Sequence, residues 1–214
     1  VDVAGKFDPQ AIANTLWAYA VLDVPPGDDL FFSELCKAAV RHCFDSFTDG
    51  NSMQIHMFLV VAKLRGWTIR GDSGLIDALR SKLGSTGRDL LAQSPVAKTS
   101  RLQADVASSV RRLGLEHEEE AIDEESGYSI DILVSHSGEH GDHVGAGKIA
   151  LEVDGPSHYL LPGRRTANGN TVLKRRVLSQ LGYQVVSVPY WEWDDVTKSN
   201  KGKDVYLRRV LGIA

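Results

Sequence analysis

The sequence predicts an all-α segment followed by an α/β domain whose elements run α-β-β-β-α-β, with a further helix at the end. Apolar residues recur at helical spacing through about the first third of the chain, which favours packed helices. Beyond residue 99, short apolar runs alternate with polar residues, which is typical of strands. We therefore expect helical repeats over residues 1–70, a linker with short helices over 71–98 and the α/β domain over 99–214.

The composition is that of an ordinary globular protein, with 43% hydrophobic and 24% charged residues among 214. No stretch approaches the roughly 20 apolar residues that cross a bilayer, so we expect no membrane span. The chain begins at Val1 without a methionine, so we expect a mature or trimmed piece of a longer product.

The first helix has a clear start signal. Asp8 can cap a helix whose first position is Pro9, where the missing N–H costs nothing. Ile12 and Leu16 then follow at helical spacing. We expect this helix to end near Leu22, before a pair of prolines.

The rest of the first hundred residues predicts further helices separated by turns. Helices are expected over residues 30–44 and 52–65, with a turn at 48–51 between them. In the glycine-rich linker we expect two short helices, at 75–83 and 88–91.

Two of these helices resemble each other. Residues 10–22 align with residues 52–64 at an offset of 42, which is typical of helix-pair repeats. Residues 12–18 (IANTLWA) resemble the octotricopeptide-type repeats, whose helices often read AN-x-LWA. One and a half repeats bury their faces poorly without neighbours, so we expect the end of a longer array or a short remnant. A generic helical bundle is the alternative.

The α/β domain shows one expected element after another. A helix capped by Ser100 comes first, and a helix capped by Thr171 precedes the last strand. The expected strands cover residues 116–122, 128–134, 148–153 and 184–188, and a closing helix starts at 206.

The net charge of -4 conceals a separation of charge along the chain. Residues 116–147 carry ten acidic residues and no Lys or Arg, whereas residues 148–214 carry eleven Lys and Arg against six Asp and Glu. Phosphate contacts are local and charges are screened within about 10 Å, so the local excess matters more than the total. Many domains carry such an excess without binding nucleic acid, so charge alone does not decide the function.

Three acids fall on the second and third expected strands. Glu152 and Asp154 are two residues apart and so share a face, while Asp131 lies inside the preceding strand. Neighbouring strands lie about 4.8 Å apart, close enough for these acids to share Mg²⁺ or Mn²⁺. Such an ion would hold a scissile phosphate and lower the pKa of the attacking water. This element order, with acids in these places, is that of the restriction-endonuclease-like, or PD-(D/E)xK-like, fold.

Each of these acids also has an ordinary interpretation. Asp154 precedes Gly155, and Asp-Gly is a good turn dipeptide by itself. His158 lies near the same strand end and is a candidate general base or metal ligand, although a lone histidine is often only hydrogen-bonded.

Basic and aromatic residues near this strand end are candidates for RNA binding. Lys174 and Arg175 on the expected helix, together with Arg164 and Arg165, would form a basic rim that reaches phosphates. A solvated helix face is the alternative for the helix residues. Trp191 would stack on an unpaired base, or else pack against the terminal helix.

The last third of the chain resembles the RAP domain. Residues 151–159 (LEVDGPSHY) are similar to the family's EVDGP-x-HF segment, and residues 168–178 (NGNTVLKRRVL) to its G-x-T-x-LKRR-x-L segment. Residues 181–193 and 206–207 complete the pattern. The resemblance implies a nuclease-like fold related to the very-short-patch repair endonucleases, and roles in binding, processing or stabilising organellar RNA. Octotricopeptide-type repeats followed by a RAP domain are a known combination.

One departure bears on activity. The nuclease superfamily usually has (D/E)-x-K, but Asp154 stands where that lysine would be. The very-short-patch relatives also lack the lysine and use a nearby histidine, which His158 would match.

The sequence thus predicts an organellar RNA-binding protein that acts in RNA processing, stability or translation, in the mitochondrion or the plastid. The alternatives are a metal-dependent endoribonuclease, and a structural RAP protein of an organellar ribosome or other ribonucleoprotein.

Overall fold

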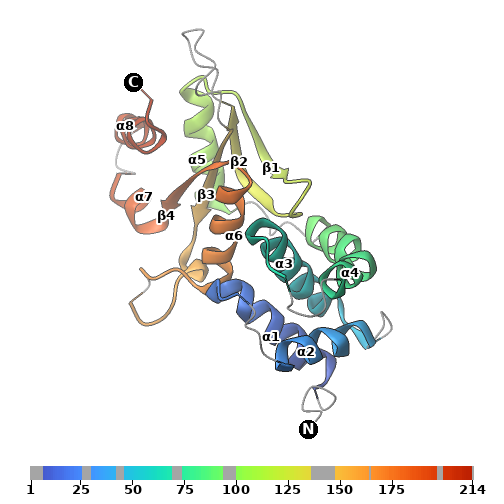
Figure 1. Ribbon diagram of the computed structural model, residues 1–214. Helices are drawn as coiled ribbons and strands as arrows, with labels where there is room; N and C mark the ends of the chain where they lie inside the picture. Colours follow the sequence, from blue (N-terminus) through green and yellow to red (C-terminus); the bar gives the residue numbers. More distant parts are fainter. Residues whose placement is uncertain are drawn as a thin grey trace. The chain divides into compact units, whose positions relative to one another are not determined.

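The computed structural model describes residues 7–25, 30–41, 46–68, 74–93, 100–135, 148–163, 165–196 and 200–213 (Figure 1). Its contacts divide the chain into two compact units. Unit 1 comprises Val1–Ser94 and Glu124–Tyr128, and unit 2 comprises Pro95–Asp123 and Ser129–Ala214. The N-terminal part is all-helical and is followed by a four-stranded mixed sheet with helices, which confirms the predicted all-α and α/β classes.

The helices of unit 1 pack around an apolar core. They are α1 (Pro9–Leu22), α2 (Leu30–Arg41), α3 (Asp49–Arg65) and α4 (Leu75–Ala92). The predicted start of α1 is confirmed, because Asp8 Oδ1 accepts a hydrogen bond from the Ala11 amide at 2.7 Å. Leu16, Phe32 and Phe58 are fully buried, so the apolar faces of three helices meet in this core.

Two expectations for unit 1 are corrected. Residues 48–51 are not a separate turn, because Thr48 caps α3 and Asn51 completes a capping box with it. One helix, α4, replaces the two short helices expected in the glycine-rich linker. Gly87 lies against α3, where an added Cβ would sit 2.4 Å from the carbonyl oxygen of Ser52. This glycine allows two helices to approach closely rather than ending one.

Unit 2 has the predicted α-β-β-β-α-β order. Its elements are α5 (Arg101–Arg112), β1 (His117–Ile122), β2 (Ser129–Ser135), β3 (Lys148–Asp154), the 3-10 helix η3 (Pro156–His158), α6 (Gly169–Gln180), β4 (Gln184–Pro189), α7 (Tyr190–Val196) and α8 (Asn200–Leu211). The sheet order is β1-β2-β3-β4. β1, β2 and β3 pair antiparallel in turn, whereas β3 and β4 pair parallel, with α6 as the crossover between them.

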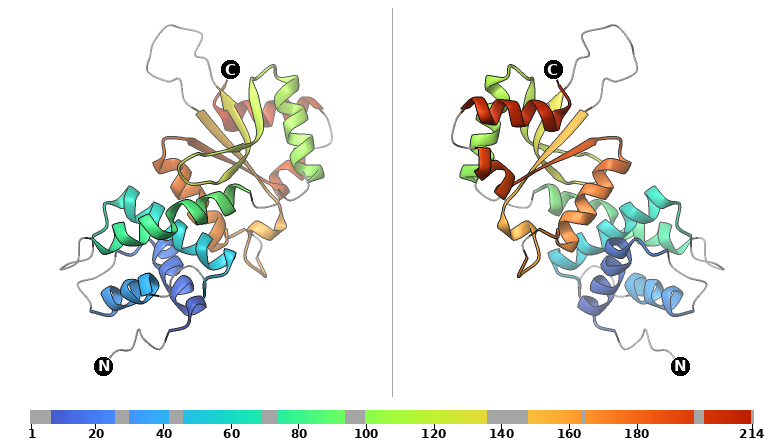
Figure 2. Two further views of the ribbon diagram at one scale, coloured as in Figure 1. Left: turned by 90° about the vertical axis from the view of Figure 1, so that its right-hand side faces the viewer. Right: turned by 90° about the vertical axis from the view of Figure 1, so that its left-hand side faces the viewer.

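Helices cover both faces of this sheet (Figure 2). On one face, α5 and α8 pack on the apolar side chains of the strands, with Val106, Ile132, Leu151 and Leu207 all fully buried. Successive strand residues point to opposite faces, so Glu152 and its alternate neighbours face α6. The structure caps α6 with Asn168, whose Oδ1 accepts from the Thr171 amide, and not with Thr171 as expected.

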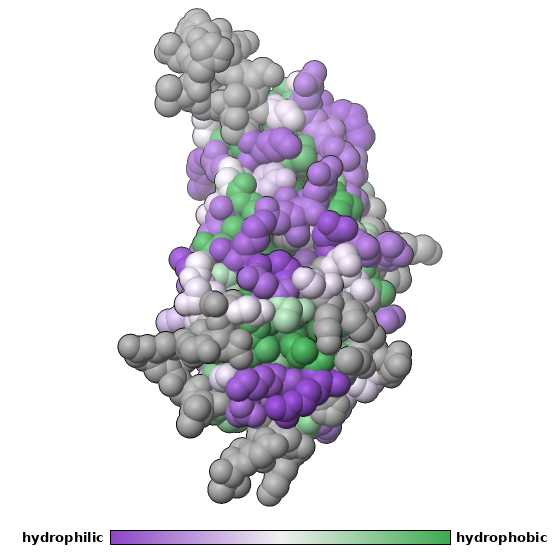
Figure 3. All heavy atoms as spheres, turned by 45° about the vertical axis from the view of Figure 1, so that its right-hand side comes forward, coloured by the Kyte–Doolittle hydropathy of each residue, from purple (hydrophilic) through white to green (hydrophobic). Residues whose placement is uncertain are grey.

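One face of the molecule is drawn in Figure 3 with its atoms coloured by hydropathy. Hydrophilic side chains predominate on the face drawn in Figure 3, with a smaller hydrophobic group among them. Within the described parts of the chain, no helix combines the length and the hydrophobicity that a membrane crossing needs.

Candidate functional site

The predicted acids lie at one end of the two central strands. In the register of the sheet, Ile132 is opposite Leu151 and Glu152 is beside Ser187 of β4. Leu151 and Val153 of β3 point to the apolar face, so Glu152 and Asp154, which alternate with them, point towards α6. Both acids are buried there. By the same register Asp131 lies opposite Glu152, so all three predicted acids are on the face of the sheet that α6 covers.

Lys174 reaches the sheet from α6 and forms an ion pair with Glu152. The side chains are 19% and 3% exposed, so this pair is largely removed from water. Burial raises the pKa of Glu152 to about 7, although the charge of Lys174 opposes this change. Burial lowers the pKa of Lys174, but the charges of Glu152 and Asp131 outweigh it and raise the pKa above its usual value.

Arg175 forms a second buried ion pair, with Asp154. The same carboxylate accepts a hydrogen bond from Ser187, and Arg175 Nη2 also donates to Ser187 Oγ at 2.8 Å. Burial would raise the pKa of Asp154, but hydrogen bonds from His158 and Ser187 and the charge of Arg175 hold it below its usual value. We call Glu152, Asp154, Lys174, Arg175 and Ser187 the charge network.

His158 is close to Asp154 at the end of β3, where Gly155-Pro156 begins the 3-10 helix. His158 Nδ1 lies 3.2 Å from Asp154 Oδ1 and 3.3 Å from the Thr171 hydroxyl. The hydrogen bond to Asp154 raises the pKa of His158. The imidazole is therefore a further hydrogen-bond partner of Asp154, and this contact favours the protonated form of His158.

Asp131 has a different partner. Its Oδ2 accepts a hydrogen bond from the Val153 amide at 2.7 Å, just beyond the last paired residues of β2 and β3. The side chain thus takes the place of a backbone acceptor where the two strands separate. Burial raises the pKa of Asp131, and the charge of Lys174 opposes that rise.

These residues do not fit Mg²⁺ or Mn²⁺ in this arrangement. Over the parts of the chain that the structure describes, no three His, Cys, Asp or Glu side chains are grouped so as to hold a metal ion. Lys174 and Arg175 already neutralise the two buried acids. Only Glu152 Oε1, among the acid oxygens described in this network, is buried without a hydrogen-bond partner.

An aromatic surface adjoins the network. The Trp191 ring lies 4.5 Å from the Tyr159 ring and 5.1 Å from the Tyr190 ring, between ring centroids. The guanidinium carbon of Arg165 lies 5.9 Å from the centre of the Trp191 ring, within the range of a cation–π contact. We call Tyr159, Arg165, Tyr190 and Trp191 the aromatic surface. The predicted Arg164 lies outside the described residues.

A short hairpin holds Arg165 in this place. Tyr159 pairs with Ala167, and the Leu160 amide donates to the carbonyl of Thr166 at 2.8 Å. Leu161, at the turn of this hairpin, is 73% exposed. The hairpin therefore presents Arg165 to the Trp191 ring and exposes the apolar side chain of Leu161.

Sequence reasoning missed Ser187 and the direction of the two helix cations. A signal for Ser187 existed, since it is the one hydroxyl within the apolar run 184–189. Lys174 and Arg175 were expected to reach solvent phosphates, and the structure turns both towards the acids of β3. Long cationic side chains cross apolar surface easily, so helix position alone does not reveal where their charges lie.

Comparison with known proteins identifies part of this unit. Residues 151–210 match the family model described as the RAP domain. The chain is 29% identical over 212 residues to a RAP domain-containing protein, chloroplastic, from Oryza sativa subsp. japonica. It is 42% identical over 64 residues to FAST kinase domain-containing protein 3, mitochondrial, from Rattus norvegicus.

The extent of these matches differs. The rice alignment covers 97% of this chain and 30% of its relative, and the rat alignment covers 30% and 10%. The chain thus corresponds to less than a third of the length of either relative. With the RAP segment following an all-helical one, the chain is a RAP domain protein, related to these chloroplastic and mitochondrial proteins.

Proposed function

We propose that this protein binds RNA in the mitochondrion or the plastid and acts there in RNA processing, stability or translation. The observation that carries the proposal is the contact between Arg165 and Trp191, because it joins a cation to a partly exposed aromatic ring within the RAP segment. The organellar names of the two relatives support the location.

The aromatic surface suits an unpaired base and its phosphate. A base stacked on an aromatic side chain contributes about 1–3 kcal/mol to binding. Trp191 would supply the stacking face, and Arg165, on the exposed hairpin, would supply the charge for the adjoining phosphate. Tyr159 is buried behind the Trp191 ring and would hold it in position.

In this proposal Lys174 and Arg175 of α6 stabilise the fold around the site and do not contact RNA. Lys174 and Arg175 are held by the acids of β3, so they anchor α6 to the sheet beside the hairpin. Removing one partner from a buried ion pair is costly, which keeps both side chains turned inwards. Phosphate contacts would therefore come from Arg165 and its surroundings rather than from the helix.

Two finer assignments belong to the same proposal. Unit 2 would have the restriction-endonuclease-like topology, which its mixed sheet and its crossover helix support. Unit 1 would be the end of an octotricopeptide-like array. A structural protein of an organellar ribosome or ribonucleoprotein would use the same aromatic surface, and RNA crosslinking in cells would distinguish it by recovering ribosomal RNA.

The proposal is tested with a fluorescent single-stranded RNA and fluorescence anisotropy. Trp191→Ala should weaken binding about tenfold, since one stacking contact is lost. Arg165→Gln should weaken it less and should lower the slope of log affinity against log salt by about one. Arg101→Gln, which changes an exposed arginine at the start of α5, is the matched control.

Equal affinities for the wild type, Trp191→Ala and Arg165→Gln would reject the aromatic surface. Absence of measurable RNA binding at low salt would reject the function itself.

A further inference from the structure

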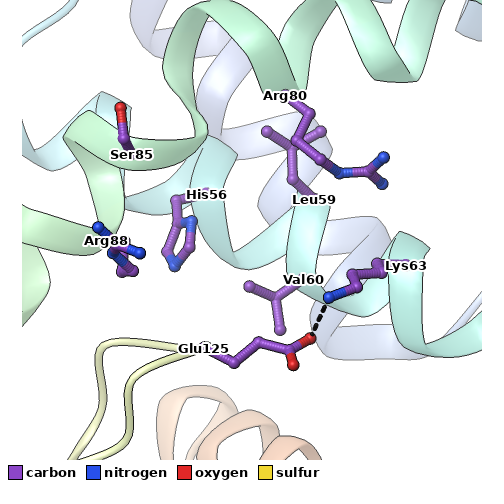
Figure 4. Close-up of a pocket in the computed structure, with 8 residues that line it drawn as sticks. All are labelled: His56, Leu59, Val60, Lys63, Arg80, Ser85, Arg88 and Glu125. Carbon is purple, nitrogen blue, oxygen red and sulfur yellow. Dashed lines mark hydrogen bonds and ion pairs between the residues drawn. The ribbon is translucent and has the colours of Figure 1, made fainter.

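Unit 1 contains a recess of about 280 Å³ between α3 and α4, bounded by Glu125 of the 124–128 turn (Figure 4). α3 contributes side chains at positions 56, 59, 60 and 63, which is the spacing of one helix face about 10 Å long. Small-ligand pockets begin near about 300 Å³, so the recess suits one compact organic molecule.

Cations outnumber acids in this lining. Lys63, Arg80 and Arg88 line the recess, with Glu125 as the one carboxylate among its lining residues. Figure 4 shows Lys63 turned towards Glu125, with Arg80 and Arg88 on opposite sides of the view. The two arginines are eight positions apart on α4, or about 12 Å along the helix axis. Cationic groups therefore lie at both ends of the recess.

Each cation now has an exposed carboxylate partner. The pairs are Lys63–Glu125 at 2.8 Å, Arg80–Asp77 at 2.6 Å and Arg88–Asp89 at 2.8 Å. The acids are 39%, 70% and 51% exposed respectively, and exposed pairs of this kind contribute little to stability. A ligand phosphate, with more charge and more acceptor oxygens, can displace them.

The middle of the recess is apolar and firmly built. Leu59 and Val60 are buried residues of α3 that line it. The His56 ring is fixed beside them, because its Nε2 lies 2.8 Å from the carbonyl oxygen of Ser126. An inorganic anion would contact none of this apolar surface. A flat heterocycle that carries a phosphate would contact both the apolar middle and the cations of the recess.

We propose that the α3–α4 recess binds a nucleoside monophosphate group. The phosphate would lie at the end formed by Lys63 and Arg80, and would displace Glu125 from Lys63. The base would lie over Leu59 and Val60, towards His56 and Arg88. The same group occurs in a free nucleotide and at the 5′-phosphorylated end of RNA, and the site is independent of the aromatic surface of unit 2.

The test is isothermal titration calorimetry of the full chain with AMP, CMP, GMP and UMP. At least one monophosphate should bind about tenfold more tightly than its nucleoside and than inorganic phosphate, since only it uses both parts of the recess. Arg80→Gln should weaken this binding about tenfold, or abolish it. Glu125→Gln should tighten it a few-fold by freeing Lys63, a change that general damage to the fold does not produce.

Arg41→Gln, an exposed arginine of the same unit outside the recess, should leave the affinity unchanged. Competition by a 5′-phosphorylated RNA, but not by its 5′-hydroxyl form, would identify an RNA end as the ligand. Failure of both RNAs to compete would identify the free nucleotide.

The proposal is overturned if none of the four monophosphates binds, or if Glu125→Gln weakens binding. Trp191→Ala separates the two proposals, because it should weaken RNA binding measured by anisotropy and leave the affinity for the bound monophosphate unchanged.

Discussion

The two faces of the unit 2 sheet are made from alternate residues of the same strands, and different interactions stabilise them. Towards α5 and α8, Leu151 and Val153 join an apolar core. Towards α6, Glu152 and Asp154 are equally buried but carry charges matched by Lys174 and by an arginine of the same helix. The apolar face gains stability from the area it buries. The charged face is stable only while each buried carboxylate is either paired with a cation or protonated.

The largest change in the free energy of unfolding is expected when Arg175 is replaced. Arg175→Met leaves Asp154 buried without its guanidinium partner and should lower the free energy of unfolding by about 3–5 kcal/mol. Urea denaturation followed by circular dichroism measures the change. Leu151→Ala is the reference for the apolar face and should cost about 2–5 kcal/mol by opening a cavity.

The exposed Arg101→Met serves as the control for removing a charge. A loss below about 1 kcal/mol for Arg175→Met would mean that Asp154 is solvated, and the contrast between the faces would fail.

A smaller effect concerns pH. The pKa of Glu152 is raised to about 7 from its usual 4.5, so the folded protein holds a proton that the unfolded chain releases between these values. The stability contributed by this proton is fully present below pH 4.5 and is lost as the pH rises through about 7. Glu152→Gln should therefore reduce the fall in unfolding free energy between about pH 5 and pH 8 by roughly 2 kcal/mol.

Leu151→Ala should shift the whole pH profile without changing its slope, because it removes no titrating group. An unchanged slope in Glu152→Gln would show that Glu152 is ionised throughout this range. His158, whose pKa is also raised, contributes a slope of the same sign and remains in both variants.

The smallest effect is expected from divalent ions. Since Lys174 and Arg175 neutralise the buried acids, about 5 mM Mg²⁺ or Mn²⁺ should change the melting temperature by less than about 1 °C relative to a chelator. A rise that disappears in Asp131→Ala would instead indicate a metal site. RNA cleavage dependent on the ion and on Asp131 would then favour the endoribonuclease.

Sequence patterns were sufficient for the order of the elements. Strand alternation placed Glu152 and Asp154 on one face, and the start signal at Asp8 was correct. Their roles with a metal stay a prediction. Sequence patterns did not predict the roles of residues that depend on tertiary contacts. The glycine-rich stretch predicts a break between residues 83 and 88, but the contact of Gly87 with α3 depends on tertiary packing and α4 continues through it. The direction of Lys174 likewise depends on tertiary packing.

The core under β3 has a consequence for how the RAP segment is handled in the laboratory. The family match begins at residue 151, but part of the apolar core that β3 joins comes from α5 and β2, through residues such as Val106 and Ile132. A recombinant fragment cut at the start of the match would expose that surface and lose two strands of its sheet. The segment that the family model matches is therefore shorter than the domain that can fold by itself. A fragment for expression should begin before α5.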